Sequence, residues 1–226
     1  MIPDLGVIIA AGGSSRRYGE KDKLTEMLGA LPVLLHSVRN FAPLTAPGNL
    51  IIAARKDALD EYAALAEKYL PEIVVRFGPG GENRTGSVRN ALAALQLTSG
   101  VVAIHDAARP LASAALLKKV ADKARITGGA IAASAVTDSL KLSGADGMIV
   151  SPVPRENIYR AETPQIFDIE KYRMACAALD GAVPTDDAEI MRLAGYPVEL
   201  VESGEWNIKL TSPGDLTKLR GCLPEN

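Results

Sequence analysis

The chain is short of the residues on which several kinds of site depend. It contains two cysteines, Cys176 and Cys222, which are far apart in the sequence, and two histidines. Cysteines without metal-ligand spacing predict neither a zinc site nor a disulfide framework, and they fit a reducing compartment. His36 falls inside an amphipathic helical segment and His105 inside an apolar run. We therefore expect no histidine-activated nucleophile, and we interpret His105 as a packed strand residue.

Neither sign of charge dominates the composition. The 25 Lys and Arg residues balance 27 Asp and Glu residues, for a formal net charge of −2. This composition lacks the basic footprint of a protein that binds duplex nucleic acid, so any bound anion must be met by a local cluster. No apolar run reaches membrane-spanning length, and Met1–Asp4 lacks the basic region of a signal peptide. We expect a cytoplasmic protein without a nucleic-acid or membrane partner.

The sequence does have a regular alternation of apolar, β-rich runs and helix-period segments. Its 226 residues are 47% hydrophobic, enough to bury one core. Strands are predicted at 5–11, 49–54, 73–77, 101–105 and 129–133, and helices at 32–41, 56–69, 83–97 and 113–127, the last capped by Ser113. This alternation predicts a single α/β domain over residues 1–226, with a Rossmann-like, largely parallel twisted sheet and helices on both faces. Ligands of such sheets bind beyond the carboxyl ends of the strands.

The alternation stops after Ser134. Two short strand candidates, 136–142 and 148–153, flank the turn Ser143–Gly147 and predict a β-hairpin. Proline and charge follow, and helices are predicted again near 168–179 and 185–193. A hairpin has too little core to be stable alone. We therefore expect this arm, at about 136–160, to pack on a second subunit and form a homodimer.

Two glycine-rich segments follow predicted strands. The first, Gly12–Gly19, contains Arg16 and Arg17, and the second, Gly78–Ser87, contains Arg84 and opens a helix. Backbone N–H groups of such turns, helix N-termini and arginine side chains all bind phosphate. The spacing matches neither a dinucleotide fingerprint nor a P-loop. The alternatives are an ordinary turn for the first segment and a loop capped by Asn83 for the second.

Charged residues mark two further segments. Asp106 ends an apolar strand, where a carboxylate can hold Mg²⁺, and Arg109 follows to orient Asp106 or to meet a phosphate. A structural Asp–Arg pair is the alternative. Lys209, in a predicted short strand at 206–211, would stabilise a phosphoryl oxygen if desolvated, and is otherwise a solvated lysine. Together these groups favour nucleotidyl transfer without a protein nucleophile.

Several segments occur in a specific order along nearly the whole chain: Ala10–Gly12 with the arginines after it, Gly80–Glu82 with Ser87, His105–Pro110, Thr163–Gln165, Thr185–Asp187 and Asn207–Lys209. In this order they resemble the 2-C-methyl-D-erythritol 4-phosphate cytidylyltransferases of the non-mevalonate isoprenoid pathway. The resemblance implies that CTP and the erythritol phosphate react, with Mg²⁺, to give the 4-diphosphocytidyl product and pyrophosphate.

The resemblance also implies a role for particular residues. Lys23, Lys209 and an arginine of the first loop would be catalytic. The nucleotide would be held by Ala10, Ala11, Gly12, Gly81, Glu82, Ser87, Asp106 and Arg109, with Asp106 also binding the metal. The acceptor phosphate would be held by Thr163, Thr185, Ser139 and Arg155. Of these, Arg155 would lie on the arm and reach across the dimer.

The chain departs from the family pattern in the first loop. Counting from Ala10–Gly12 makes Arg16 the catalytic arginine, whereas anchoring on Arg17–Gly19 makes it Arg17, which we favour slightly. The proline and glutamine that usually flank the catalytic lysine are missing. Lys21 is therefore an alternative to Lys23, and a solvated charged face is a third interpretation of this segment.

A second departure lies near the C-terminus, where Trp206 stands in place of an acid expected to help bind the metal. Either Glu205 substitutes for this acid, or Asp106 acts with phosphates and water alone.

Two alternatives to the implied activity stay open. One is a relative that uses ribitol 5-phosphate, because acceptor choice depends on arm residues. The other is a catalytically weak nucleotide-binding homologue, suggested by the altered first loop.

Overall fold

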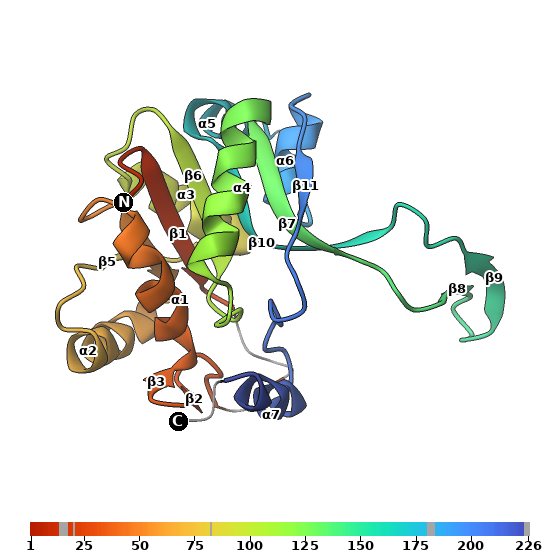
Figure 1. The fold of residues 1–226 in the computed structure, drawn as a ribbon, viewed down its shortest axis with the longest axis horizontal. Coiled ribbons are helices and arrows are strands. Elements are labelled where there is room, and N and C mark those ends of the chain that lie inside the picture. The colour runs from red at the N-terminus through yellow and green to blue at the C-terminus, as the bar shows by residue number, and fades with distance from the viewer. Residues whose placement is uncertain (14–17, 20, 82, 180–183, 224–226) are drawn as a thin grey trace.

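A central β-sheet with helices on both faces forms the body of the protein (Figure 1). The computed structural model describes residues 1–13, 18–19, 21–81, 83–179 and 184–223. The sheet has seven strands in the order β11-β7-β10-β6-β1-β4-β5. In chain order these are β1 (Leu5–Ala11), β4 (Leu50–Ala54), β5 (Arg76–Pro79), β6 (Val101–Asp106), β7 (Gly129–Ala135), β10 (Tyr159–Asp168) and β11 (Glu199–Glu202). Of these seven strands, β10 alone runs antiparallel to its neighbours, so the predicted largely parallel sheet is confirmed.

The helices form a layer on each face of the sheet. One layer contains α1 (Val33–Phe41), α2 (Leu59–Tyr69), α4 (Ala114–Thr127) and α7 (Pro213–Gly221), and the other contains α3 (Arg84–Ala94), α5 (Ile169–Ala177) and α6 (Asp187–Leu193). Successive residues of β1 alternate between the layers, because Val7 and Ile9 pack in the first and Ile8 in the second. This burial on both faces accounts for the unbroken apolar runs in the sequence. No helix within the described ranges is long and apolar enough to cross a membrane.

Most predicted elements are present with shifted ends, and Ser113 caps α4 by accepting a hydrogen bond from the Leu116 N–H at 3.1 Å. Two predictions are wrong. Residues 73–75 are not in a strand, because the Ile73 N–H closes a turn on the Leu70 carbonyl at 3.0 Å and β5 begins only at Arg76. Residues 206–211 form an irregular loop. One backbone hydrogen bond of 2.7 Å, from Leu210 to Ala108, ties this loop to the end of β6.

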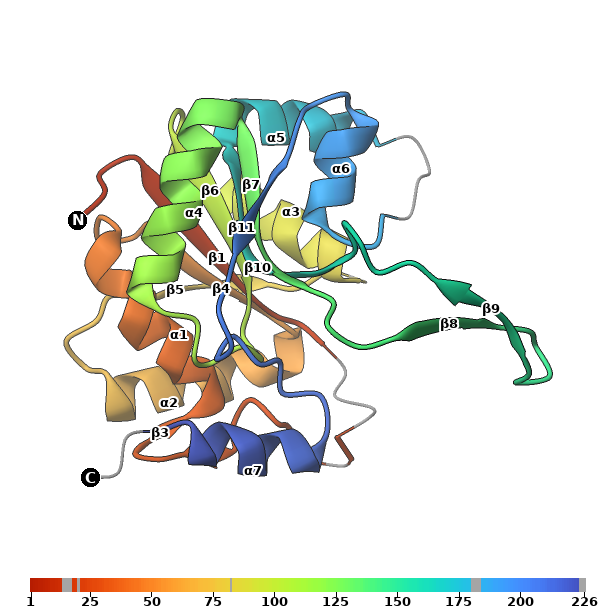
Figure 2. The same ribbon diagram turned by 45° about the vertical axis from the view of Figure 1, so that its right-hand side comes forward.

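Smaller elements complete the fold. They are β2 (Met27–Leu28), β3 (Leu31–Pro32), the 3₁₀ turns η1 (Ala42–Leu44) and η2 (Lys56–Ala58), and the hairpin strands β8 (Leu140–Ser143) and β9 (Ile149–Val153). The hairpin projects well away from the sheet (Figures 1 and 2). Met148, Ile149 and Val150 are each more than 60% exposed at its far end. The predicted hairpin is therefore present, with a shorter first strand than expected.

His105 is a packed strand residue, as predicted. It is fully buried in β6, and its ring meets the Phe41 ring edge-on at a centroid distance of 4.9 Å. Its ring nitrogens lie 3.1 Å from the Arg109 carbonyl oxygen and 3.1 Å from Thr163 Oγ1. Burial disfavours the charged imidazolium and lowers the pKa of His105 to about 4. The folded protein thus holds this histidine neutral.

The neutral His105 predicts a loss of stability in mild acid. The unfolded chain binds a proton at this position below its ordinary pKa of 6.5, whereas the folded chain does so only near 4. The free energy of unfolding should therefore fall as the pH is lowered, by about 2 kcal/mol between about pH 7 and about pH 5. Urea unfolding of the wild type and of His105→Gln measures this difference. Equal pH slopes in the two proteins would show that His105 contributes nothing.

Candidate active site

Loops that are far apart in the sequence meet at the carboxyl edge of the parallel strands. Ala10 of β1 is in register with Asp106 of β6, and the Ala107 N–H donates to the Ala10 carbonyl at 3.1 Å. On the other side of β1, the Gly80 N–H donates to the Ala54 carbonyl of β4 at 2.5 Å. The predicted nucleotide segments therefore lie at adjacent strand ends, where ligands of such sheets bind.

Close backbone packing joins the two glycine-rich segments. The Gly81 N–H donates to Ser87 Oγ at 2.9 Å, and this hydroxyl donates to the Asn83 carbonyl at 2.9 Å. A Cβ on Gly81 would lie 2.5 Å from the Gly86 carbonyl carbon, and one on Gly12 would lie 3.0 Å from Ser87 Oγ. A side chain at Gly81 would therefore displace the backbone of this turn. The predicted residues Arg16, Arg17 and Glu82 lie outside the described residues.

Asp106 is the charged centre of this edge. Its Oδ2 lies 2.6 Å from Lys209 Nζ, and its Oδ1 lies 3.2 Å from Arg84 Nε. Burial by itself would raise the pKa of this carboxyl, but the charges of Arg84 and Lys209 outweigh burial and hold the pKa well below its usual range. The Asp106 N–H also donates to Thr163 Oγ1 at 3.0 Å. The site therefore presents a fixed carboxylate between two cations.

Arg84 connects this carboxylate to the other side of the sheet edge. Its Nη1 lies 2.5 Å from Oδ2 of Asp187, which is fully buried at the start of α6. The hydroxyl of Tyr172 donates to Asp187 Oδ1 at 2.6 Å. Sequence reasoning placed Arg84 near a ligand but missed its partners. The signal that could have found this pair is that Arg84 and Asp187 each begin a helix directly after a loop of the site.

Arg109 forms no ion pair with Asp106 and bonds instead to residues from other segments. Its Nη1 donates to the Asn207 carbonyl at 2.6 Å and lies 3.7 Å from Glu162 Oε2. Its Nε is buried without a hydrogen-bond partner among the described residues. Burial lowers the pKa of this guanidinium, against the opposing effects of Asp106 and Glu162. Arg109 is therefore held beside Asn207 and Glu162, and the alternative interpretation, a structural pair of Asp106 and Arg109, is wrong.

Lys23 reaches the same edge from the N-terminal part of the chain. Its Nζ donates to the carbonyl oxygen of Leu210 at 2.9 Å, one residue beyond Lys209. The preceding Asp22 fixes this turn, because it accepts hydrogen bonds from the Leu24 N–H at 3.0 Å and the Tyr62 hydroxyl at 2.6 Å. Lys21, the alternative candidate, is exposed.

The predicted acceptor residues are distributed over three places. Thr163 is buried against Asp106, whereas Thr185 is exposed and donates from Oγ1 to Glu189 Oε2 at 2.9 Å. Ser139 and Arg155 are exposed on the arm, next to β8 and β9, where Arg155 donates to the Thr137 carbonyl. Of the predicted acceptor residues, Thr163 is thus the one that the structure brings to Asp106 within one chain.

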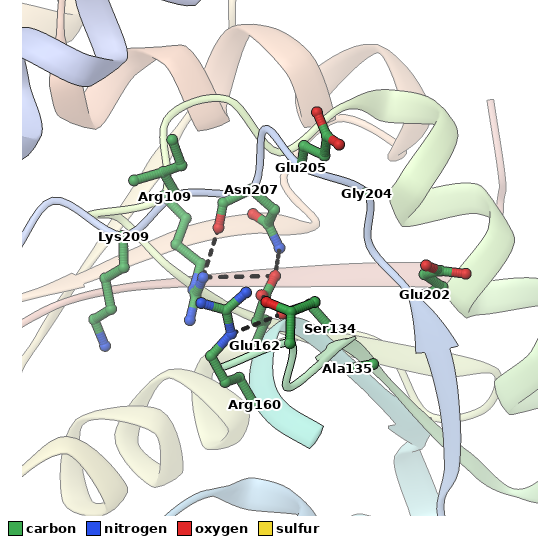
Figure 3. A pocket seen from close by; sticks show the side chains of 12 residues that line it. Arg109, Ser134, Ala135, Arg160, Glu162, Glu202, Gly204, Glu205, Asn207 and Lys209 are labelled. Carbon is green, nitrogen blue, oxygen red and sulfur yellow. Dashed lines mark hydrogen bonds and ion pairs between the residues drawn. The ribbon is translucent and has the colours of Figure 1, made fainter. Parts of the chain in front are cut away.

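A cavity of about 510 Å³ opens beside Lys209 (Figure 3). Three cations line it, Arg109, Arg160 and Lys209, together with Glu162 and two further acids, Glu202 and Glu205. Arg109 lies against Glu162, whereas the side chain of Lys209 points away from it (Figure 3). The side chain of Glu205 points away from the three cations in the same view. Such a lining suits an anionic, hydroxyl-bearing molecule next to the Asp106 centre.

Asp106 is the carboxylate that this edge offers to a metal. Among the described residues, no group of three or more His, Cys, Asp or Glu side chains could hold a metal ion. Mg²⁺ keeps most of its waters and is commonly bound by one or two carboxylates together with substrate phosphates. The donor set therefore fits an ion held mainly by a triphosphate, with Asp106 as its protein ligand.

Comparisons with known proteins agree with this geometry. Residues 5–223 match the family model for 2-C-methyl-D-erythritol 4-phosphate cytidylyltransferase (IspD). An enzyme of that name from Acidobacterium capsulatum is 35% identical over 218 residues, which cover 94% of this chain and 90% of the relative. A second from Symbiobacterium thermophilum is 36% identical, with 98% and 93% coverage.

A solved structure agrees with these sequence matches. The crystal structure of the enzyme of the same name from Thermus thermophilus superposes with a TM-score of 0.80 at 28% identity, covering 96% of this chain and 98% of that one. The order of the site segments, the sheet that carries them and these matches support one conclusion. The chain belongs to the 2-C-methyl-D-erythritol 4-phosphate cytidylyltransferase family.

Proposed function

We propose that this protein transfers the cytidylyl group of CTP to 2-C-methyl-D-erythritol 4-phosphate. The products are 4-diphosphocytidyl-2-C-methyl-D-erythritol and pyrophosphate. The observation that carries the proposal is the convergence of Lys23 and Lys209 with Asp106 at one sheet edge, beside the glycine-rich turn of Gly81. The free cysteines, Cys176 and Cys222, are the basis for placing the enzyme in a reducing cytoplasm.

The reaction needs positioning and charge rather than a protein nucleophile. A phosphate oxygen of the acceptor attacks the α-phosphorus of CTP, the new P–O bond forms, and the bond to the pyrophosphate oxygen breaks in line. Lys209 and Lys23 stabilise the negative charge on the oxygens of the transferred phosphoryl group. The turn at Gly81 and Ser87 provides backbone contacts for the nucleoside, and Arg16 or Arg17 would act from the first loop.

We assign the acceptor to the cavity lined by Arg109 and Lys209. The polar groups of this cavity are suited to hydroxyl groups, and its cations to a phosphate. The erythritol phosphate is the acceptor named for the family. No contact among the described residues favours ribitol 5-phosphate, so that acceptor serves as the comparison in the assay.

Mg²⁺ is the expected metal. When bound, it neutralises phosphate charge and polarises the α-phosphoryl group. Asp106 would hold it from the protein side. Both oxygens of Asp106 are paired with Lys209 and Arg84, so a cation there must share or replace one of these partners. Thr163 keeps the backbone of Asp106 in place while this exchange occurs.

The arm is proposed to form a homodimer. It leaves Leu142, Met148, Ile149 and Val150 exposed on a hairpin that has no core of its own. Arg155 and Ser139 lie on the same arm, outside the cavity of their own chain. A second copy that received the arm would bury these apolar residues and bring Arg155 to its acceptor phosphate.

Lys209→Ala tests the catalytic proposal. Because the variant removes a preorganised charge from the transition state, kcat should fall by about 10² to 10³-fold. Pyrophosphate release with CTP and each polyol phosphate measures this loss and identifies the acceptor. Lys118→Ala, an exposed lysine of α4, is the matched control. Wild-type turnover by Lys209→Ala would show that Lys209 is not a catalytic residue. If the wild type binds CTP but turns over neither acceptor, the result would favour a catalytically weak nucleotide-binding homologue.

Asp106→Asn tests the metal proposal. The amide keeps the size of the side chain but loses the charge that attracts Mg²⁺. The Mg²⁺ concentration for half-maximal activity should rise by about tenfold or more, a cost of at least about 1.4 kcal/mol in metal binding. Titration of activity with Mg²⁺ at saturating CTP gives this value. An unchanged Mg²⁺ dependence would mean that the phosphates alone bind the ion.

Ile149→Asp tests the role of the arm. A charge on the exposed apolar end of the hairpin cannot be buried without cost, so the dimer should dissociate at micromolar protein concentration. Sedimentation velocity measures the mass, and Ile126→Asp, on the exposed surface of α4, is the control. A monomeric wild type, or a variant that stays dimeric, would rule out the arm as the dimer contact.

A further inference from the structure

We propose that Glu162 is a positioning residue that fixes the Lys209 segment and couples it to the root of the arm. The inference rests on the proposed function, because it assigns to Lys209 a role in the reaction. Glu162 lines the cavity, but both of its carboxylate oxygens are bonded to protein groups, and it acts through these neighbours. Three elements meet at its carboxylate: the loop after β6, the strand β10 and the irregular loop that carries Lys209.

An irregularity of β10 places Glu162 at the site. Ala161 pairs with Ala133 of β7, and Gln165 pairs with Ile131. Three residues of β10 thus lie opposite a single residue of β7. Bulges of this kind bend a strand and re-aim its side chains, and they are common beside active sites. This one turns Glu162 into the interior near the end of β6, where it is only 8% exposed.

One carboxylate oxygen of Glu162 holds two site segments together (Figure 3). Its Oε2 accepts a hydrogen bond from Asn207 Nδ2 at 2.8 Å and lies 3.7 Å from Arg109 Nη1. That guanidinium donates to the Asn207 carbonyl at 2.6 Å, which closes the contact. Asn207 Nδ2 also donates to the Thr163 carbonyl at 2.9 Å. The irregular loop is thereby fastened to the sheet edge two residues before Lys209.

The other oxygen faces the arm. Its Oε1 accepts a hydrogen bond from Ser134 Oγ at 2.7 Å, and this hydroxyl accepts one from Arg160 Nε at 3.1 Å. Ser134 belongs to β7 and Arg160 to β10, the two strands that lead into the arm and out of it. A shift of the arm root therefore moves the same carboxylate that holds Asn207.

Loss of Glu162 has a predictable consequence. Asn207 would keep a single hydrogen bond for its amide, and Arg109 would lose its nearest carboxylate while buried. An unpaired buried charge destabilises a protein by more than the intact ion pair stabilises it. Arg109 and Asn207 would therefore rearrange to find new partners. Lys209 acts at the transition state, so displacing it should lower kcat more than it raises the KM for CTP.

The test combines kinetics with backbone exchange in the full chain. Pyrophosphate release and amide hydrogen exchange of residues 206–211 are measured for Glu162→Ala, Glu162→Gln, Asn207→Ala and the double variant Glu162→Ala/Asn207→Ala. Glu67→Gln is the control, because Glu67 is an exposed acid of α2 away from the cavity. Exchange of residues 116–124 in α4 serves as an internal reference.

We expect Glu162→Ala and Asn207→Ala each to lower kcat by about tenfold or more and to speed exchange at 206–211. The double variant should lose no more than the worse single variant, since both remove one interaction. Glu162→Gln should lose less activity than Glu162→Ala, because its amide oxygen still accepts from Asn207 although the charge beside Arg109 is gone.

Three results would overturn the proposal. They are kinetics of Glu162→Ala equal to those of Glu67→Gln, losses that multiply in the double variant, and unchanged exchange at 206–211. If Glu162→Ala does not fold, Asn207→Ala decides, because wild-type kcat and exchange in that variant would also contradict the proposal. A wild type without turnover would refute the proposed function instead. The exchange comparison would then still show whether Glu162 fixes the Lys209 segment.

Discussion

The whole site depends on the shared carboxylate of Asp106. A buried negative charge is tolerated only because Lys209 and Arg84 lie against its two oxygens. These partners lie 22 residues before and 103 residues after Asp106 in the sequence, so the ion pairs also fix where α3 and the loop of Lys209 sit relative to β6. Replacing either cation would leave the buried Asp106 carboxylate with one partner fewer, although the side chain of Lys209 is itself 42% exposed. Stability and chemistry are therefore linked at this point.

The sheet explains why these groups converge. Strands β1, β4, β5 and β6 are parallel, so their following loops leave from one edge. Glycines at that edge let two loops pack backbone to side chain, as at Gly81 and Ser87. The antiparallel β10 enters from the same edge and contributes Thr163 beside Asp106. A parallel framework with one reversed strand thus provides both the nucleotide side and the acceptor side.

Much of this architecture could be predicted from the sequence, because buried parallel strands are continuous apolar runs and are easily found. The strand β10 was missed because its first half contains the charged residues Arg160 and Glu162, and because Pro164 follows, which favours a loop interpretation. The strand predicted at 206–211 was wrong, because apolar residues beside Lys209 contact the end of β6 without joining the sheet.

The site was predictable in its residue types but less so in its pairs. Lys209 pairs with Asp106, and Lys23 bonds to the backbone one residue beyond Lys209. Arg109, in contrast, pairs with Glu162, and it is Arg84 that lies beside Asp106. Such pairs depend on tertiary geometry, which spacing along the chain does not encode. A crystal structure of the complex with CTP and Mg²⁺ tests the central claim most directly. The account predicts the α-phosphate within hydrogen-bond distance of Lys209 Nζ; a triphosphate bound away from Asp106 and Lys209 would contradict it.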